Sequence, residues 1–274
     1  MKKIVLLAAA ITCLVTSVSA QKKEKPYKEI FYKDILTEFN DMTVSTNNGV
    51  SDKEMTKFKL KITNKTNDVL IFKPEESVIK AAKEVKPKEK WMYIYASESD
   101  SKVINAMGPD FLMPYSYVLS GMYKVSTSGK AIETPNFQLP ASQNEFTSGP
   151  FSCTMLSLTK ESDKTEVKFE CKYTGDKVGV IQPGRSAVKL PDGTEIANEK
   201  KAGLLSSNNP IILMKGKSEK VTFKWNRMDG GRAQDMQKIK LEVLFRNTFS
   251  EVYLEKMNDE TINFEIDEKI SKKS

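Results

Sequence analysis

The chain has 274 residues, with 43 lysines and arginines against 36 aspartates and glutamates, a formal net charge of +7, and no histidine. The absence of histidine excludes Ser-His-Asp and Cys-His catalytic relays and HExxH zinc sites. A hydrophobic content of 39% with 9% aromatic residues is enough for a packed core, so the composition excludes an intrinsically disordered chain.

The first twenty residues have the layout of a secretory signal peptide. Lys2 and Lys3 precede an apolar run over 4–18, and small residues stand before the boundary after Ala20. The run is too short for a membrane-spanning helix. We therefore predict cleavage after Ala20 and a secreted or periplasmic mature protein without a transmembrane segment. Cys13 lies inside the run rather than at its end, which is a poor match to the lipobox of a lipoprotein.

A charged segment over 21–40 follows the predicted leader, and a basic tail over 268–274 ends the chain. Between 29 and 268 the chain holds 34 basic and 35 acidic residues, so the net positive charge lies at the two ends. A nucleic-acid-binding domain carries its basic stripe on folded elements. The sequence therefore predicts no nucleic-acid partner.

An internal repeat organises the rest of the chain. A shift of 109 positions places residues 56–80 on 165–189 without a gap, with six identities in 25 positions. Apolar positions fall on apolar positions, as Phe58 does on Val167. A period of this length is too long for a solenoid repeat and is about the size of one immunoglobulin-like sandwich.

Short alternating segments separated by polar turns fill the second copy, and long helical periodicity is absent. Its strands are expected at 151–155, 167–173, 178–181, 187–190, 211–214, 221–225, 239–245, 252–254 and 262–266. In the first copy, Pro74 followed by two glutamates also fits the start of a short helix, whereas the repeat predicts a strand there. The sequence predicts an all-β chain of two antiparallel β-sandwich modules in tandem, over 41–140 and 141–267.

This layout resembles the tandem immunoglobulin-like modules of exported bacterial proteins. The resemblance covers roughly 40–267 and is carried by an alternating strand that ends in Thr-Asn-Lys-Thr-Asn-Asp at 63–68, followed by Val69 and Ile71. A strand-glycine-strand unit over 211–225 also carries it. The resemblance implies adhesion, scaffolding or ligand binding and supplies no catalytic residue. The Cys-Trp-Cys spacing of antibody domains is absent.

Two cysteines of the predicted mature chain, Cys153 and Cys171, lie on adjacent predicted strands. An exported chain meets an oxidising compartment, which permits a disulfide. In a hairpin centred on Ser162, position i pairs with position 324 minus i, so Cys153 faces Cys171 and Met155 faces Phe169. A disulfide and two buried thiols both fit this pairing.

The predicted strand at 90–95 has two apolar faces. Trp91, Tyr93 and Tyr95 share one face, and the methionine and isoleucine between them point to the other. One interpretation is that one face packs in the sandwich and the other beneath a loop or the neighbouring module. The second is an exposed aromatic ladder that stacks on sugar rings, because large exposed apolar patches usually have a function.

The segment 103–123 is a second candidate surface. Asp110 is its only charged residue, in a chain that is 29% charged, and methionines and tyrosines are frequent in it. It is interpreted either as core strands with a loop or as a surface that adapts to protein or peptide partners. The candidate binding residues of the two surfaces are Trp91, Tyr93, Tyr95, Tyr115, Tyr117, Met122 and Tyr123.

Enzymatic chemistry finds little support in the sequence. No pair of carboxylates stands in an apolar setting of the kind that raises a pKa, and there is no phosphate-binding loop or CxxC motif. We predict a non-enzymatic binding, adhesion or scaffold protein with no metal or cofactor, whose partner is a protein or glycan on the cell envelope. The alternative is a secreted glycan-active enzyme or enzyme inhibitor, which requires a cleft with two carboxylates about 5–10 Å apart.

Overall fold

A computed structural model describes residues 26–198, 209–227 and 235–273. The expected signal peptide, its cleavage site after Ala20 and Cys13 lie outside these ranges. Within them the chain is all-β, with antiparallel sheets and no α-helix, which confirms the predicted fold class at that level. None of the helical segments in these ranges is long and apolar enough to cross a lipid bilayer.

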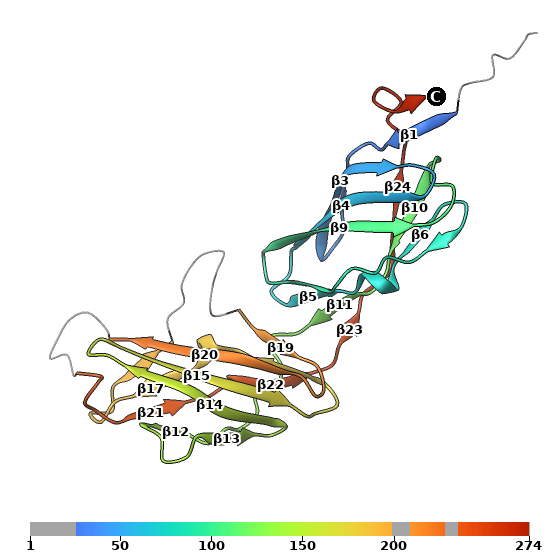
Figure 1. The fold of residues 1–274 in the computed structure, drawn as a ribbon. Helices are drawn as coiled ribbons and strands as arrows, with labels where there is room; N and C mark the ends of the chain where they lie inside the picture. The colour runs from blue at the N-terminus through green and yellow to red at the C-terminus, as the bar shows by residue number, and fades with distance from the viewer. Residues whose placement is uncertain (1–25, 199–208, 228–234, 274) are drawn as a thin grey trace, which may run out of the picture.

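Two lobes follow one another along the molecule (Figure 1). Lobe 1 contains strands β1–β11 and β23–β25, and lobe 2 contains β12–β22. The strands of lobe 1 are β1 (Tyr27–Phe31), β2 (Ile35–Glu38), β3 (Met42–Ser51), β4 (Met55–Asn64), β5 (Val69–Phe72), β6 (Val78–Lys80), β7 (Glu84–Val85), β8 (Met92–Ile94), β9 (Ser99–Met107), β10 (Tyr115–Leu119), β11 (Met122–Val125), β23 (Glu255–Lys256), β24 (Glu260–Phe264) and β25 (Lys272–Lys273). The strands of lobe 2 are β12 (Phe137–Leu139), β13 (Glu145–Ser148), β14 (Phe151–Lys160), β15 (Lys164–Tyr173), β16 (Val178–Ile181), β17 (Ala187–Lys189), β18 (Glu195–Ala197), β19 (Ile211–Leu213), β20 (Ser218–Asn226), β21 (Leu241–Leu244) and β22 (Phe249–Val252).

The 109-residue repeat is also a repeat of structure. Adding 109 to the bounds of β3, β4, β5 and β6 gives the bounds of β14, β15, β16 and β17. The 3-10 helices Pro74–Glu76 and Pro183–Arg185 are related by the same shift, and each is followed by a strand. Both alternatives for the segment after Pro74 are therefore realised, as one short turn of helix and then β6.

Each lobe encloses its core between two antiparallel sheets. In lobe 1 the sheet β25-β1-β3-β4-β9, with β2 also on β3, packs with the sheet β24-β10-β6-β7; in lobe 2 the sheet β13-β14-β15-β20 packs with β12-β21-β17-β18. A smaller sheet of each lobe, β23-β11-β5-β8 or β19-β16-β22, contributes to the contact between the lobes. Strand β4 shows why one sheet face is buried, because Phe58, Leu60 and Ile62 alternate with lysines that point outward.

Each lobe is completed by the strand that follows the other copy of the repeat. In lobe 1, Ile262 of β24 pairs with Tyr117 of β10, and in lobe 2, Phe137 of β12 pairs with Val243 of β21. Tyr117 and Val243 are equivalent positions, because their second partners, on β6 and β17, differ by 109 residues. Strands β24 and β12 therefore fill the same place in the two lobes, and the copies exchange their last strands reciprocally.

The exchange corrects the predicted module boundaries. The chain leaves lobe 1 after β11 and supplies β12 to lobe 2, then returns after β22 and supplies β23–β25 to lobe 1, so neither 41–140 nor 141–267 encloses a module. The charged segment 21–40 contains β1 and β2, and the basic tail 268–274 contains β25, whose Lys272 Nζ lies 2.6 Å from Glu29 Oε2. Alternation of apolar residues identifies strands but does not identify their partners.

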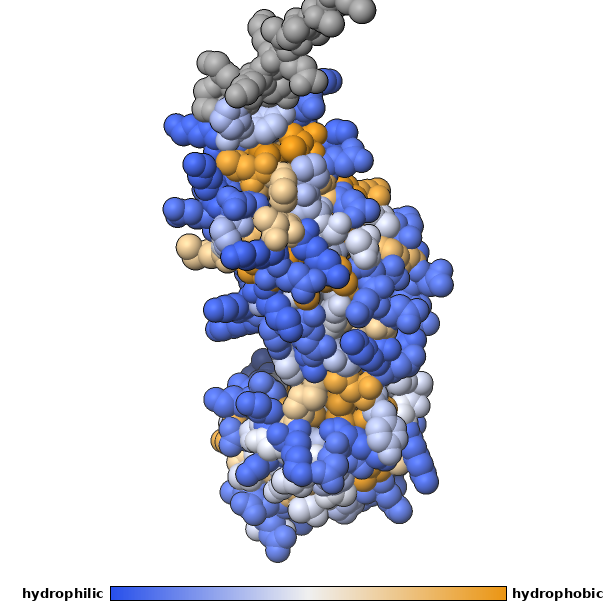
Figure 2. All heavy atoms as spheres, turned by 90° about the vertical axis from the view of Figure 1, so that its right-hand side faces the viewer, coloured by the Kyte–Doolittle hydropathy of each residue, from blue (hydrophilic) through white to orange (hydrophobic). Residues whose placement is uncertain are grey.

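The junction between the lobes is apolar and built from equivalent residues on both sides. Its buried side chains are Val69, Ile71 and Val125 of lobe 1 and Val178, Val180 and Val252 of lobe 2. The two sets correspond, because β5 and β16 differ by 109 residues and Val125 and Val252 pair with their first residues. Such an isologous interface is the kind found in two-fold symmetric dimers. Figure 2 shows hydrophobic residues at the level where the lobes meet.

Hydrogen bonds from both lobes hold the linker between β11 and β12 across this junction. The backbone nitrogen of Thr127 donates to Asp68 Oδ1 of lobe 1 at 2.9 Å, and its carbonyl accepts from Gln182 Nε2 of lobe 2 at 2.7 Å. The Arg185 guanidinium donates to the same carbonyl at 3.1 Å. A Cβ added to Gly129 would lie 2.4 Å from the side chain of Val252, so the linker passes too close to β22 for a larger residue.

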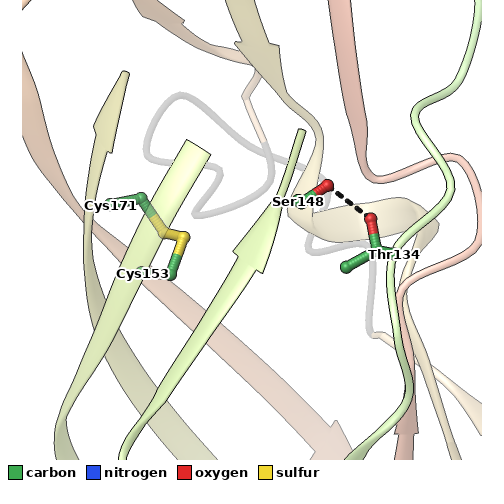
Figure 3. Close-up of a disulfide and its surroundings, with 4 residues drawn as sticks. All are labelled: Thr134, Ser148, Cys153 and Cys171. Atoms are coloured by element: carbon green, nitrogen blue, oxygen red, sulfur yellow. Dashed lines mark hydrogen bonds between the residues drawn. A yellow bond between two sulfur atoms is a disulfide. The ribbon is translucent and has the colours of Figure 1, made fainter. Parts of the chain in front are cut away.

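Cys153 and Cys171 form a disulfide between β14 and β15, with a Cα–Cα separation of 4.1 Å (Figure 3). The predicted pairing is confirmed, because Cys153 pairs with Cys171 and Met155 with Phe169. The turn is not centred on Ser162. A bulge after Met155 changes the sum of paired residue numbers from 324 to 325, and the pairing then continues to the turn in the new register.

The disulfide occupies a position that lobe 1 fills with two aliphatic side chains. Subtracting 109 from Cys153 and Cys171 gives Val44 and Ile62, which pair across β3 and β4. We expect Cys153→Ala/Cys171→Ala to lower the free energy of unfolding of lobe 2 by about 3 kcal/mol or more, because both loop closure and apolar contact are lost.

The variant Cys153→Val/Cys171→Ile, which copies lobe 1, should recover the contact but not the loop closure. Urea unfolding followed by the fluorescence of buried Trp225 measures both variants. Reductant should lower the midpoint of the natural chain and leave that of the Val/Ile variant unchanged. An unchanged midpoint for the reduced natural chain would contradict a stabilising disulfide.

Candidate functional site

Strand β8 turns its two apolar faces in two directions. Met92 and Ile94 are buried in the core of lobe 1. Trp91, Tyr93 and Tyr95 are half-buried and pack against the junction cluster. The face shared by the three aromatic residues is therefore covered in part by the neighbouring lobe, as the first interpretation of this strand predicted, and it is not a free ladder.

Trp91 and Tyr123 hold an ammonium group that belongs to the chain itself. Lys73 Nζ lies 4.6 Å from the ring centroid of Trp91 and 4.2 Å from that of Tyr123. Glu76 supplies the countercharge, with a carboxylate oxygen 3.6 Å from Lys73 Nζ, and Glu75 accepts from Trp91 Nε1 at 2.6 Å. The Tyr123 hydroxyl donates to Glu76 at 2.7 Å, and this hydrogen bond is the main cause that raises the pKa of Tyr123 to about 12. Two rings and a carboxylate thus form a filled cation site.

Tyr93 and Tyr95 line an open cleft between the lobes. The cleft has one part of about 490 Å³ beside lobe 1 and another of about 310 Å³ that reaches lobe 2, and both tyrosines line both parts. We call this the inter-lobe cleft. Its lining residues are Tyr93, Ile94, Tyr95, Ser97, Glu98, Ser99, Asp100, Asn209, Ile211, Ile212, Glu219 and Lys220.

The inter-lobe cleft is acidic. Its charged residues are Glu98, Asp100 and Glu219 against Lys220. Burial raises the pKa of Tyr95, and the Glu98 and Glu219 carboxylates raise it further, so its phenol is neutral at physiological pH. The pKa of Tyr93 is raised as well, first by burial and then by the Glu219 carboxylate. The cleft therefore offers neutral aromatic rings beside negative charge.

The aromatic character of this cleft belongs to lobe 1 alone. Ile94 pairs with Leu70, and Leu213 pairs with Gly179, so β8 and β19 correspond with a shift of 119. By that shift, Ile212 is the lobe 2 equivalent of Tyr93, and a methionine is the equivalent of Tyr95. The pseudo-symmetric junction thus differs at this edge, where one side supplies tyrosines and the other supplies aliphatic residues.

The predicted surface at 103–123 is wrong for its central residues. Tyr115, Tyr117 and Met122 are buried in the core of lobe 1, and the ring of Tyr115 stacks on Phe264 of the exchanged strand with centroids 4.6 Å apart. The inward positions of β10 alternate with half-exposed ones, so this part of the segment is poor in charge because its inward residues are core. Of its methionines, Met107 is strongly exposed, with 72% of its surface accessible.

The lobe 2 side of the inter-lobe cleft was not predicted from the sequence. Ile211, Glu219 and Lys220 stand more than a hundred residues from Tyr95 and reach it only through the junction. In the part of the chain that the structure describes, no group of three metal-ligating side chains is present. No protein-family model matches the chain, and no curated protein sequence matches it significantly.

Proposed function

We propose that the chain is an exported, non-enzymatic binding protein of two immunoglobulin-like modules whose inter-lobe cleft receives a lysine or arginine side chain of a protein on the cell envelope. The leader-like first twenty residues support export. The pair of packed antiparallel sheets in each lobe supports the sandwich assignment. The observation that carries the ligand class is the neighbouring cation site, where Trp91, Tyr123 and Glu76 surround the ammonium of Lys73.

The inter-lobe cleft offers the same chemical groups to an external cation. Tyr93 and Tyr95 supply ring faces whose quadrupole attracts positive charge. Glu98, Asp100 and Glu219 add three negative charges against one positive charge. Because the tyrosines are half-buried, an ammonium placed beside them meets less water than at an open surface, and each contact is stronger for that reason.

The remaining lining residues suit the backbone around such a side chain. Ser97, Ser99 and Asn209 bring hydroxyl and amide groups that both donate and accept hydrogen bonds. Ile211 and Ile212 bring an apolar wall for the methylenes of a lysine or arginine. A site of this size is smaller than a standard protein interface, so the cleft on its own predicts weak binding that gains strength from further contacts or several copies.

A titration of the mature chain with short peptides tests the proposal. The probes are acetyl-Gly-Ser-Lys-Ser-Gly-amide and its norleucine counterpart, followed by the NMR shifts of cleft residues at two salt concentrations. We expect only the lysine peptide to bind, with weaker binding at high salt. Tyr95→Leu/Glu219→Gln should weaken it at least about tenfold, equivalent to 1.4 kcal/mol.

Matched substitutions outside the cleft control for general effects. Tyr253→Leu alters a tyrosine that is 76% exposed, and Glu166→Gln alters an acid on the outward face of β15. Both should leave the dissociation constant unchanged. Equal binding of the norleucine peptide, or binding of a neutral oligosaccharide in the cleft in place of the lysine peptide, would overturn the basic-side-chain assignment.

A further inference from the structure

We propose that the groove between β12 and β13 of lobe 2 is a second binding site, specific for a neutral oligosaccharide. Strand β12 ends one sheet of lobe 2 and β13 ends the other, so each has an open edge on this side of the core. The groove between them has a volume of about 510 Å³. It is distinct from the inter-lobe cleft and shares no lining residue with it.

Two phenylalanines form the floor of this groove. Phe137 and Phe146 keep 7% and 8% of their surface accessible, and their ring centroids are 5.6 Å apart. Both rings pack edge-on against Phe169 of the core, at 5.4 and 5.2 Å. The floor is therefore apolar and fixed in position from behind, and only a small part of each ring reaches solvent.

The walls of the groove are held at a set distance. The hydroxyls of Thr134, which precedes β12, and Ser148, at the end of β13, are hydrogen-bonded at 2.5 Å (Figure 3). The short connection over 140–144 joins the two strands at the other end. A groove whose walls are tied at both ends loses little conformational entropy when a ligand binds.

The rim carries mainly amides and hydroxyls, with Glu145 as its one charged residue. Its polar residues are Asn136, Gln138, Ser142, Gln143, Thr147 and Ser152. From Thr134 to Thr159, Glu145 is the only charged residue, although the chain as a whole is 29% charged. Amide and hydroxyl groups both donate and accept hydrogen bonds, which matches the hydroxyls of a sugar.

Lobe 1 shows that this low number of charges is not required by the fold. Strand β2 corresponds to β13, because Thr37 and Phe146 pair with residues that differ by 109 positions. The corresponding seam of lobe 1, between β2 and the returning chain, opens as a pocket of about 370 Å³. Its charged lining residues are Glu38, Asp41, Lys124, Glu255, Lys256 and Glu260. The lobe 2 groove has one charged lining residue, Glu145, where the lobe 1 pocket has these six.

The open edges do not favour an added peptide strand. Strand β12 has three residues and β13 has four, and short edge strands are poor templates for β-pairing. An uncharged ligand that bonds through hydroxyls and brings apolar C–H groups against the small exposed parts of Phe137 and Phe146 fits better. The groove also lies at the opposite end of the molecule from β1 and β25, which pair near the two termini (Figure 1).

Titration of the mature chain with neutral hexasaccharides tests this inference. Cellohexaose, xylohexaose, maltohexaose and chitohexaose are the probes, each followed by NMR to about 10 mM, a range that detects millimolar affinity. We expect at least one probe to shift the aromatic resonances of Phe137 and Phe146. Gln138→Ala/Gln143→Ala should weaken that probe at least about tenfold, and Thr147→Lys should weaken it as well.

The controls separate this site from the rest of the molecule. Gln237→Ala changes an exposed glutamine of lobe 2 outside the groove and should leave binding unchanged. Tyr95→Leu should also leave it unchanged, so failure of the inter-lobe proposal and failure of this one are distinguishable. The altered glutamines and Thr147 are exposed and Tyr95 is half-buried, and thermal melts of every variant confirm folding. The inference is overturned if none of the four probes shifts groove resonances, if the glutamine variant binds equally well, or if an uncharged peptide binds the groove instead.

Discussion

Aspartate at the inward positions of β24 should unfold lobe 1 and leave lobe 2 folded. Ile262 and Phe264 are each 2% exposed, and Phe264 contacts Tyr115 and Phe58 of the lobe 1 core. Burying an unpaired charge at either position, together with the loss of the apolar contact, costs several kcal/mol, a large fraction of the 5–15 kcal/mol that stabilises a typical domain. The variant to test is Ile262→Asp/Phe264→Asp.

The two tryptophans report on the two lobes separately. Trp91 lies on lobe 1 at the junction, and Trp225 is fully buried in the core of lobe 2. In the variant, the Trp91 emission should shift to longer wavelength while that of Trp225 stays in place, as single-tryptophan versions with phenylalanine at the other site would show. The matched control Thr261→Asp/Asn263→Asp changes the outward residues of the same strand and should unfold neither lobe. A folded lobe 1 in the inward variant would contradict the strand exchange.

Residues 129–252 should fold alone, whereas 141–252 should not. The longer fragment contains every strand of lobe 2, from β12 to β22, and the shorter one lacks residues 129–140, which include β12 and the bridge from Ala131 to Ser250. Without β12 the core lacks Phe137 and Leu139, which are 7% and 0% exposed, and β21 loses its outer partner. Loss of two large buried side chains costs about 5–8 kcal/mol, enough to unfold a domain of ordinary stability.

Cooperative urea unfolding and a dispersed NMR spectrum are the measurements for the two fragments. The longer fragment should show both, and the shorter one should show neither. A third fragment, 129–252 with Phe137→Ala, should retain folding with reduced stability, because β12 still pairs with β21. Cooperative unfolding of 141–252 with the stability of the longer fragment would show that β12 is dispensable.

Local features of the chain were predictable because their causes lie within a few residues. The alternation of Phe58, Leu60 and Ile62 with lysines places β4 in a half-buried sheet without knowledge of any neighbour. The pairing of Cys153 with Cys171 followed from alternation on two strands joined by a short turn. Only the bulge after Met155, which re-centres that turn, escaped the pattern.

The candidate site was predictable only in part. The strand around Tyr93 and Tyr95 could be found from its two apolar faces, because each face needs a cover. At 103–123 the sequence did not distinguish a binding surface from core strands, because both are poor in charged residues. In the structure Tyr115 and Tyr117 are core. The groove in lobe 2 had a signal in the sequence, the stretch over 134–159 with one charged residue, but its two walls meet only through the fold.

By itself, the sequence determined the all-β class, the 109-residue repeat and the residues that face inward on most strands, because these depend on periodicity along one segment. Tertiary structure alone decided that β24 completes lobe 1 and β12 completes lobe 2. The two strands follow equivalent copies and carry the same inward pattern, so either lobe offers each of them a suitable edge. The choice depends on the path of two linkers across an apolar junction, and contacts between residues more than a hundred positions apart set that path.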